Sequence, residues 1–329
     1  MRYVPGILLC LALAVLAQAL QFAEIRLFGQ AWLDDLVLAI LIGLFTRAVW
    51  RPSPIWEAGT HFSSKLLLEF AIVLLGASVS GQTVLALGPV LLVGIAVVVL
   101  LALGAGYLAC RALRLPHKLA VLVACGNAIC GNSAIVAAAP VIGAEAEDVA
   151  ASIAFTAVLG VLVVLLLPLL IPVLRLSVTQ YGVLAGLTVY AVPQVQAATL
   201  PIGALSNQIG MVVKLVRVLI LGPVIAGLAL ANGRDGKALP PLRHLLPWFI
   251  VGFIVMLGLR SAGVIPLYAL PAIKSVASVL TTISMAGLGL RTDIRSVAHA
   301  GPRVTLAVTL SLGILTVISL GLIALLGVA

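Results

Sequence analysis

The segment Gly126-Asn-Ala-Ile-Cys-Gly-Asn-Ser133 is a polar, glycine-containing run inside a long apolar stretch. It begins about ten residues after Pro116, or roughly 15 Å along a helix, which is near the middle of a bilayer. Lipid cannot satisfy free backbone groups, so an unwound segment at this depth must face protein, water or a ligand. Half-helices that end there would direct N–H groups and positive dipole ends toward the break, which favours an anion. The residues that we expect to line a binding site here are Asn127, Cys130, Gly131, Asn132 and Ser133.

The composition of the whole chain requires a membrane. Of the 329 residues, 63% are apolar and 9% are charged, against roughly 45–50% and about 25% in soluble domains. The mean hydropathy of +1.29 also excludes a disordered chain. The net charge of +9 is spread singly or in small groups between apolar runs, so it predicts membrane topology rather than nucleic-acid binding. The four cysteines lie within or at the ends of apolar stretches, so we expect neither a disulfide framework nor a metal site.

Turn and charge signals divide the chain into eleven apolar runs, each near the length of about 20 residues that a spanning helix needs. The runs are 4–21, 33–49, 65–81, 84–110, 118–140, 149–174, 180–203, 207–231, 243–261, 266–290 and 303–328. They predict an all-α polytopic membrane protein of about 11 transmembrane helices, with a single transmembrane domain over residues 1–329.

The basic residues predict the orientation of these helices. With a cytoplasmic N-terminus, most of the 19 Lys and Arg side chains fall on the cytoplasmic side, while Glu145, Glu147 and Asp148 fill one outer loop. The positive-inside rule therefore predicts a cytoplasmic N-terminus and an outer C-terminus. One alternative is that the first run is a cleavable signal peptide, because Arg2 precedes it and Ala17-Gln-Ala19 resembles a cleavage site.

The runs after the first divide into two sets of five, over 33–174 and 180–328. Residues 1–32 then form an extra N-terminal helix and loop. A repeat unit with an odd number of helices inserts upside down relative to its copy, as in many secondary transporters. We therefore expect two inverted five-helix repeats.

A second polar stretch, 281–289, follows Leu270-Pro271 in the fourth run of the second half. Its spacing from the proline matches that of the first stretch, so we expect it to be interrupted and to cross the first one. Ser284, Met285 and Gly287 would then join the site. The alternative is that the small residues of both stretches only allow close helix packing, which is common in membranes.

Several polar side chains inside the runs need an explanation, because a charge at the centre of a spanning helix costs about 2.5 to 3.5 kcal/mol. Lys214 and Arg217 are three residues apart and share one helix face, which suits an anionic substrate. The alternative is that Glu69 neutralises one of them while Arg217 reaches the interface. Glu69 is also the candidate for proton coupling, although an i,i+4 pair with Lys65 explains it equally well.

Pro193 must interrupt the hydrogen-bond ladder of the seventh run. Gln194 and Gln196 follow it. We expect their amides either to line a substrate path or to cap the carbonyls that the proline frees.

Several motifs carry a resemblance to a known family. The most specific is Ile129-Cys-Gly-Asn-Ser-Ala-Ile135, and further matches are Lys214-Leu-Val-Arg217, Pro247-Trp-Phe249 and Met285-Ala-Gly-Leu-Gly289. They occur in the order in which they stand in the YeiH-type sulfate exporters, a family of bacterial inner-membrane proteins that the chain resembles over nearly its whole length. The resemblance implies an inner-membrane location and two inverted five-helix repeats with crossed broken helices, as in bile-acid symporters and sodium/proton antiporters.

One position departs from that family pattern. Tyr190 and Ala191 stand where the family often carries a His and an acidic residue. Proton coupling through that pair is therefore not expected here.

Together these features predict a secondary transporter that moves a small anion, sulfate by resemblance, across the lipid bilayer around a site at the crossing. No glycine-rich nucleotide loop with Lys-Ser/Thr occurs in the sequence, so a gradient of substrate, H⁺ or Na⁺ must supply the energy. A sodium- or proton-coupled organic-acid symporter and a passive channel are the alternatives within transport.

An intramembrane enzyme is not expected, because the four His residues all map to the cytoplasmic edge, far from the break. The sequence calls for no cofactor. It leaves open whether the protein forms a homo-oligomer.

Overall fold

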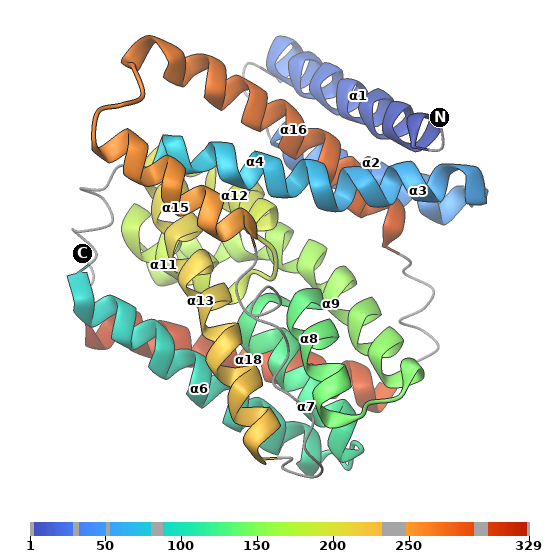
Figure 1. Ribbon diagram of the computed structural model, residues 1–329, viewed down its shortest axis with the longest axis vertical. Coiled ribbons are helices and arrows are strands. Elements are labelled where there is room, and N and C mark those ends of the chain that lie inside the picture. Colours follow the sequence, from blue (N-terminus) through green and yellow to red (C-terminus); the bar gives the residue numbers. More distant parts are fainter. Residues whose placement is uncertain are drawn as a thin grey trace. The chain divides into compact units, whose positions relative to one another are not determined.

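The structure, a computed structural model, describes residues 3–28, 33–50, 53–79, 88–231, 248–292 and 302–327. Within these ranges the chain forms helices joined by short turns, and no strand occurs in them (Figure 1). Seven of the described helices are long and apolar enough to cross a membrane, and shorter apolar helices accompany them. The chain is therefore an all-helical membrane protein, as its composition predicts.

Each predicted run overlaps a helix or a pair of helices. In chain order they are α1 (Val4–Phe28), α2 (Asp35–Val49), α3 (Pro54–Phe62) with α4 (Leu68–Leu75), α6 (Gly88–Ala112), α7 (His117–Cys125) with α8 (Asn132–Ile142), α9 (Ala146–Leu166) with α10 (Leu170–Leu174), α11 (Val178–Thr188) with α12 (Val192–Thr199), α13 (Ala204–Ala231), α15 (Trp248–Ser261), α16 (Leu270–Arg291) and α18 (Pro302–Leu325). The residues 243–247 of the ninth run lie outside the described residues. The number of membrane crossings stays a prediction.

One helix begins earlier than its run predicts. The third run was expected from residue 65, but the helix starts at Pro54 and continues through a π turn, Ser63–Leu67, into α4. A proline in the first turn costs no hydrogen bond, because the N–H groups of that turn have no partner within the helix. Pro54 therefore marks the start of this helix, eleven residues before the predicted run begins.

Local signals fix other helix starts. The Asp34 carboxylate accepts a hydrogen bond from the N–H of Leu36, 3.1 Å away, and caps α2. Ser177 caps α11 in a reciprocal pair: its hydroxyl accepts from the N–H of Gln180 at 3.1 Å, while its own N–H donates to the Gln180 side chain at 2.9 Å. Such caps satisfy N–H groups that the first turn leaves without partners.

The helices group into two compact units. Unit 1 comprises Met1–Thr83 and Phe249–Asp293, and unit 2 comprises Val84–Trp248 and Ile294–Ala329. Each unit takes helices from both halves of the sequence, so the units do not follow the predicted division into 33–174 and 180–328. The repeat itself stays a prediction.

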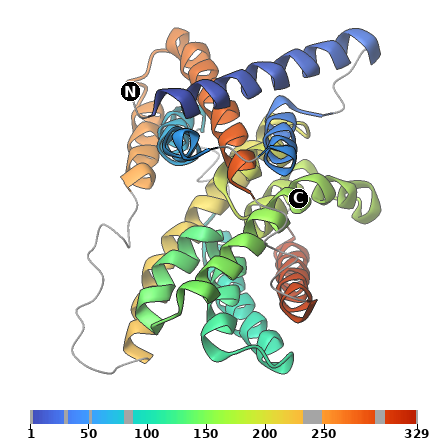
Figure 2. The ribbon, with the colours of Figure 1, turned by 90° about the vertical axis from the view of Figure 1, so that its right-hand side faces the viewer.

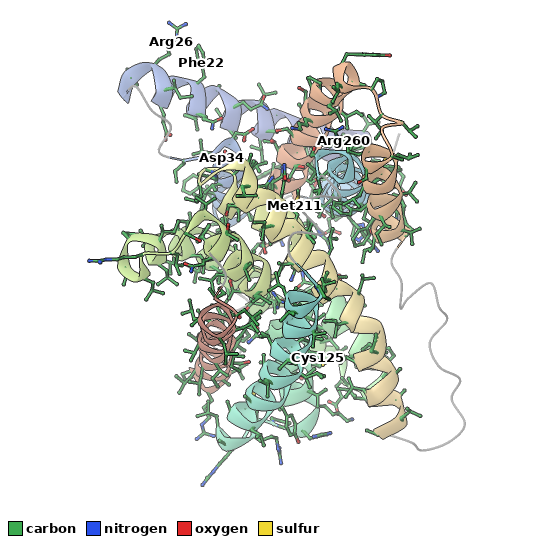
Figure 3. The ribbon with its side chains drawn as sticks, turned by 90° about the vertical axis from the view of Figure 1, so that its left-hand side faces the viewer. Phe22, Arg26, Asp34, Cys125, Met211 and Arg260 are labelled. Carbon is green, nitrogen blue, oxygen red and sulfur yellow. The ribbon has the colours of Figure 1, made fainter. Side chains whose placement is uncertain are left out.

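Unit 1 is built on close helix contacts. α16 packs along α2 and α4, and α1 packs on α2 and α3. A Cβ atom added to Gly289 on α16 would lie 2.3 Å from the Ile40 carbonyl oxygen of α2, so the two backbones touch. At the C-terminal end of α1, the Arg26 guanidinium lies 4.9 Å from the centre of the Phe22 ring (Figure 3).

Unit 2 contains α6 to α13 and α18. α6 and α18 are far apart in the sequence but lie side by side in both ribbon views (Figures 1 and 2). A buried cluster that includes Leu119, Phe155 and Val308 joins α7, α9 and α18. This packing holds the interrupted helices of the unit in place.

Candidate functional site

The first interruption lies where the polar run 126–133 predicts it. α7 continues into a π turn, Gly126–Cys130, whose last bond runs from the Gly131 N–H to the Gly126 carbonyl at 2.8 Å. Gly131 then adopts φ 67° and ψ −124°, and α8 begins at the next residue. This backbone conformation strongly favours glycine. The predicted break in the fifth run is confirmed.

The second interruption separates α11 from α12. Val189 and Ala191 are extended, with ψ of 143° and 148°, and α12 begins at Val192 with Pro193 in its first turn. The Gln194 side chain accepts a hydrogen bond from the Ala191 N–H at 3.2 Å, so it caps the new helix. The break near Pro193 is therefore as predicted, and of the two expected roles Gln194 has a capping one, directed at an N–H group rather than a carbonyl.

The two interruptions meet inside unit 2. The Tyr190 hydroxyl donates to Oδ1 of Asn127 at 2.8 Å, and Nδ2 of Asn127 donates to the Val308 carbonyl of α18 at 3.0 Å. Both side chains are buried. A Cβ atom on Gly131 would lie 3.2 Å from Cβ of Tyr190, so the backbones pass closely. We call this meeting of residues 126–133 with residues 189–191 the crossing.

The expected partner of the first break was wrong. α16 is a continuous helix through residues 281–289, and Pro271 lies in its first turn, where it breaks no helical hydrogen bond. The hydroxyl of Ser284 donates to the Leu280 carbonyl one turn back, at 2.6 Å, and so leaves the helical ladder intact. Ser284 and Met285 are buried in unit 1, where a Cβ on Gly287 would lie 3.2 Å from the Ser64 nitrogen. The small residues of this stretch serve packing, which was the alternative interpretation.

Lys214 and Arg217 lie on α13, and neither side chain has any exposed surface. Among the described residues, all their hydrogen-bond partners are backbone carbonyls at the crossing or, for Gly186, in the last turn of α11. Lys214 Nζ donates to Ile129 at 2.8 Å; Arg217 donates to Asn127 at 2.9 Å, Gly186 at 3.0 Å, Ala128 at 3.2 Å and Val189 at 3.4 Å. Figure 3 labels Met211, one turn before Lys214, and Cys125, the last residue of α7.

Arg217 does not reach the interface, as one alternative required, because its side chain has no exposed surface. That Glu69 neutralises one of the two cations stays a prediction. Glu69 lies on α4 in unit 1, whereas carbonyl oxygens of unit 2 take up the hydrogen bonds of both cations. Among the described residues of unit 2, neither cation is paired with a carboxylate. A role of Glu69 in coupling stays a prediction.

The N-terminal end of α8 is open. Asn132 and Ser133 are exposed, Cys130 is half-buried, and α8 has no side-chain cap. Among the described residues, no acceptor binds the N–H groups of Asn132 and Ser133. The Asn132 side chain is held from α9, because Thr156 donates to its Oδ1 at 2.6 Å. This end of the crossing can therefore donate hydrogen bonds to a solute.

The structure brings most of the predicted site residues into unit 2 but does not give all of them the expected role. Both polar atoms of the Asn127 side chain are hydrogen-bonded, to Tyr190 and to Val308. Gln196 is buried, and its Oε1 has no hydrogen-bond partner among the described groups. The sequence interpretation missed Tyr190, which it noted only as a departure from a family pattern. A tyrosine three residues before Pro193 in an apolar run was the available signal.

A separate cavity of about 490 Å³ lies in unit 1. Its lining includes the charged residues Arg47, Glu57 and Arg291, and His61. None of the predicted site residues borders it.

A family model and the similar proteins all point to one family. Residues 5–308 match a family model described as "Conserved hypothetical protein 698". A UPF0324 membrane protein of Brucella melitensis is 59% identical over 99% of this chain and 91% of its own length. UPF0324 membrane proteins of Agrobacterium fabrum (55% identical, 98% and 92% covered) and Bacillus cereus (37% identical, 92% and 86% covered) are also similar. No solved structure matches. The YeiH-type resemblance is thereby confirmed, and the chain belongs to the UPF0324 family of membrane proteins.

Proposed function

We propose that this protein is a secondary transporter that carries a small anion by alternating access around the crossing. The observation that carries the proposal is the pair of fully buried cations, Lys214 and Arg217, without a carboxylate partner among the described residues of unit 2. A buried charge is expensive in a membrane and usually marks a substrate or ion pathway.

The electrostatic balance at the crossing favours an anion. Arg217 carries a full positive charge, to which Lys214 adds when it is protonated, while the carboxyl ends of α7 and α11 that they touch each carry only about half a negative charge. The N-terminal end of α8 adds positive potential. The sum is positive, so a negative solute is attracted and a free cation is repelled.

The open end of α8 supplies the direct contacts in this proposal. The N–H groups of Asn132 and Ser133, together with the Ser133 hydroxyl, offer several donors within one helical turn. Lys214 and Arg217 contribute only electrostatic attraction and no direct contact, because their own N–H groups already donate to backbone carbonyls. An oxyanion accepts several hydrogen bonds at once, which fits such a cluster.

The resemblance to the YeiH-type proteins makes sulfate, or a related sulfonate, the first substrate to test. The same resemblance suggests the inner membrane of a bacterium as the location. Energy would come from a gradient, since the chain carries no nucleotide-binding loop.

A flux assay tests the proposal. Purified protein in liposomes is offered radiolabelled sulfate, sulfite, a sulfonate and a dicarboxylate, and uptake is compared with that of protein-free liposomes. The decisive variant is Ser133→Asp, at the second residue of α8. A carboxylate there stabilises the helix N-terminus, so the fold should survive, while its charge competes with the anion.

The matched control is Ala146→Asp, at the first residue of α9. It adds the same charge to the first turn of a helix that starts away from the crossing. We expect wild type and Ala146→Asp to transport at least one of the anions and Ser133→Asp to lose that flux. Absence of flux for every anion in the wild type, or equal rates in Ser133→Asp, would contradict the proposal.

A further inference from the structure

The carbonyls that Lys214 and Arg217 bind are those that the two breaks leave without partners. In the first helix the Gly126 carbonyl is used by Gly131, and the next three in sequence are free of helical bonds. Those three, Asn127, Ala128 and Ile129, each receive one donor from the two cations. The two cations thus satisfy three of the carbonyls that the helix end leaves without partners.

The same guanidinium also reaches the second helix. Nη1 of Arg217 donates to Gly186, in the last turn of α11, and to Val189, the residue after it. One side chain therefore joins the carboxyl ends of both interrupted helices. Five carbonyl oxygens converge on two nitrogen-bearing groups within 3.4 Å.

Carbonyl oxygens freed at helix breaks are the ligands that bind Na⁺ in many membrane transporters. Here the positions of such an ion are taken by a Lys and an Arg that are part of the chain. Arg stays protonated at every physiological pH and cannot leave the site. The carbonyl cluster is therefore permanently occupied by positive charge.

We propose that Lys214 and Arg217 are built-in substitutes for a coupling cation, so that the anion crosses this site without Na⁺ or another metal cation. The inference rests on the proposed function, and it assigns the coupling of the same site. It also has a structural corollary that does not require transport: removal of the Arg217 side chain leaves four carbonyls that an added Na⁺ can bind.

The first experiment uses the wild-type protein. Anion flux into liposomes is measured in sodium, potassium and choline buffers of equal ionic strength. We expect equal rates in the three buffers. Flux that is lost without Na⁺ overturns this inference while leaving anion transport standing, whereas no flux in any buffer overturns the proposed function instead.

The second experiment asks whether Na⁺ stabilises a variant in which the carbonyls have lost the Arg217 side chain. Melting temperatures of purified wild type, Arg217→Ala and Lys274→Ala are compared in sodium chloride and choline chloride. Lys274 is a matched control, because it is an exposed cation on another membrane helix, α16. We expect Na⁺ to raise the melting temperature of Arg217→Ala by a few degrees and to leave the other two unchanged.

An Arg217→Ala protein that shows the same melting temperature in both salts overturns the latent cation site. If that variant fails to fold, the flux of Arg217→Lys is measured instead, in the same three buffers as the wild type. It keeps the charge but offers fewer donors, so its flux should fall while remaining independent of Na⁺. Flux of Arg217→Lys that requires Na⁺ would show that the fixed charge does not replace the ion.

Discussion

At the scale of single residues, Gly131 decides whether the first break can form. Its φ of 67° with ψ of −124° is costly for any residue with a side chain, and a Cβ would also press on Tyr190 at 3.2 Å. We expect Gly131→Ala to lower the free energy of unfolding by about 1–3 kcal/mol. Gly143 is the matched control, because its φ is 61° but nothing lies within 4 Å of its Cβ position. Gly143→Ala should cost about 1 kcal/mol. Thermal unfolding in detergent measures both, and an equal or larger loss in Gly143→Ala would contradict the close approach at the crossing.

Tyr190 makes the only side-chain hydrogen bond between the two breaks among the described residues. Tyr190→Phe leaves Oδ1 of Asn127 buried without a donor, which we expect to cost about 1–3 kcal/mol. Tyr181→Phe is the control: that hydroxyl is equally buried and donates to the Ala198 carbonyl at 2.9 Å, away from Asn127. Both variants should have a lower melting temperature than the wild type, but only Tyr190→Phe should slow anion flux. Equal flux in the two variants would remove Tyr190 from the site.

At the scale of helices, the sequence predicted the breaks at 126–133 and near Pro193 correctly, but the interruption expected at 281–289 does not exist. The run 126–133 and the run 281–289 both combine glycine with small polar residues about ten positions after a Leu-Pro pair. In membranes such residues either interrupt a helix or let two helices touch. The composition of a segment does not tell which of the two it does. Only the tertiary partners separate them: Arg217 satisfies the freed carbonyls of the first run, whereas Ile40 lies against Gly289 in the second. The break at 189–191 carries no glycine; Pro193 predicted the interruption, but nothing in the sequence marked it as the partner of the first break.

The packing use of α16 can be tested directly. A Cβ on Gly289 would lie 2.3 Å from the Ile40 carbonyl and 2.8 Å from the Leu44 nitrogen, so Gly289→Ala must push α2 and α16 apart. We expect a loss of about 1–3 kcal/mol, as for other overpacked contacts. Gly258 on α15 has nothing within 4 Å of its Cβ position, and Gly258→Ala should be neutral or stabilise the helix by up to about 1 kcal/mol. The melting temperatures of the two variants are compared with that of the wild type. A Gly289→Ala protein as stable as the wild type would refute the contact between α2 and α16.

At the scale of the whole molecule, the crossing and its cations belong to one unit. Unit 2 holds both interrupted helices together with Lys214 and Arg217, while α16 belongs to unit 1. Each unit combines helices from before and after residue 175. A division of the sequence into consecutive halves therefore does not coincide with the packed units. The cause is physical, because packing joins helices by complementary faces and not by order along the chain.

The orientation of the molecule in the membrane can be tested at the two ends of one span. α9 and α10 run from Ala146 to Leu174, so Glu145 and Arg175 should lie on opposite faces of the bilayer. The positive-inside rule places Arg175 in the cytoplasm and Glu145 outside. In a protein whose cysteines at 10, 110, 125 and 130 are replaced, a membrane-impermeant maleimide applied to intact spheroplasts should label Glu145→Cys and spare Arg175→Cys. Both positions are exposed, so both variants should react after the membrane is dissolved in detergent. The reverse labelling would invert the predicted topology, with the N-terminus outside. Labelling of both variants in intact spheroplasts would mean that this helix pair does not cross the membrane.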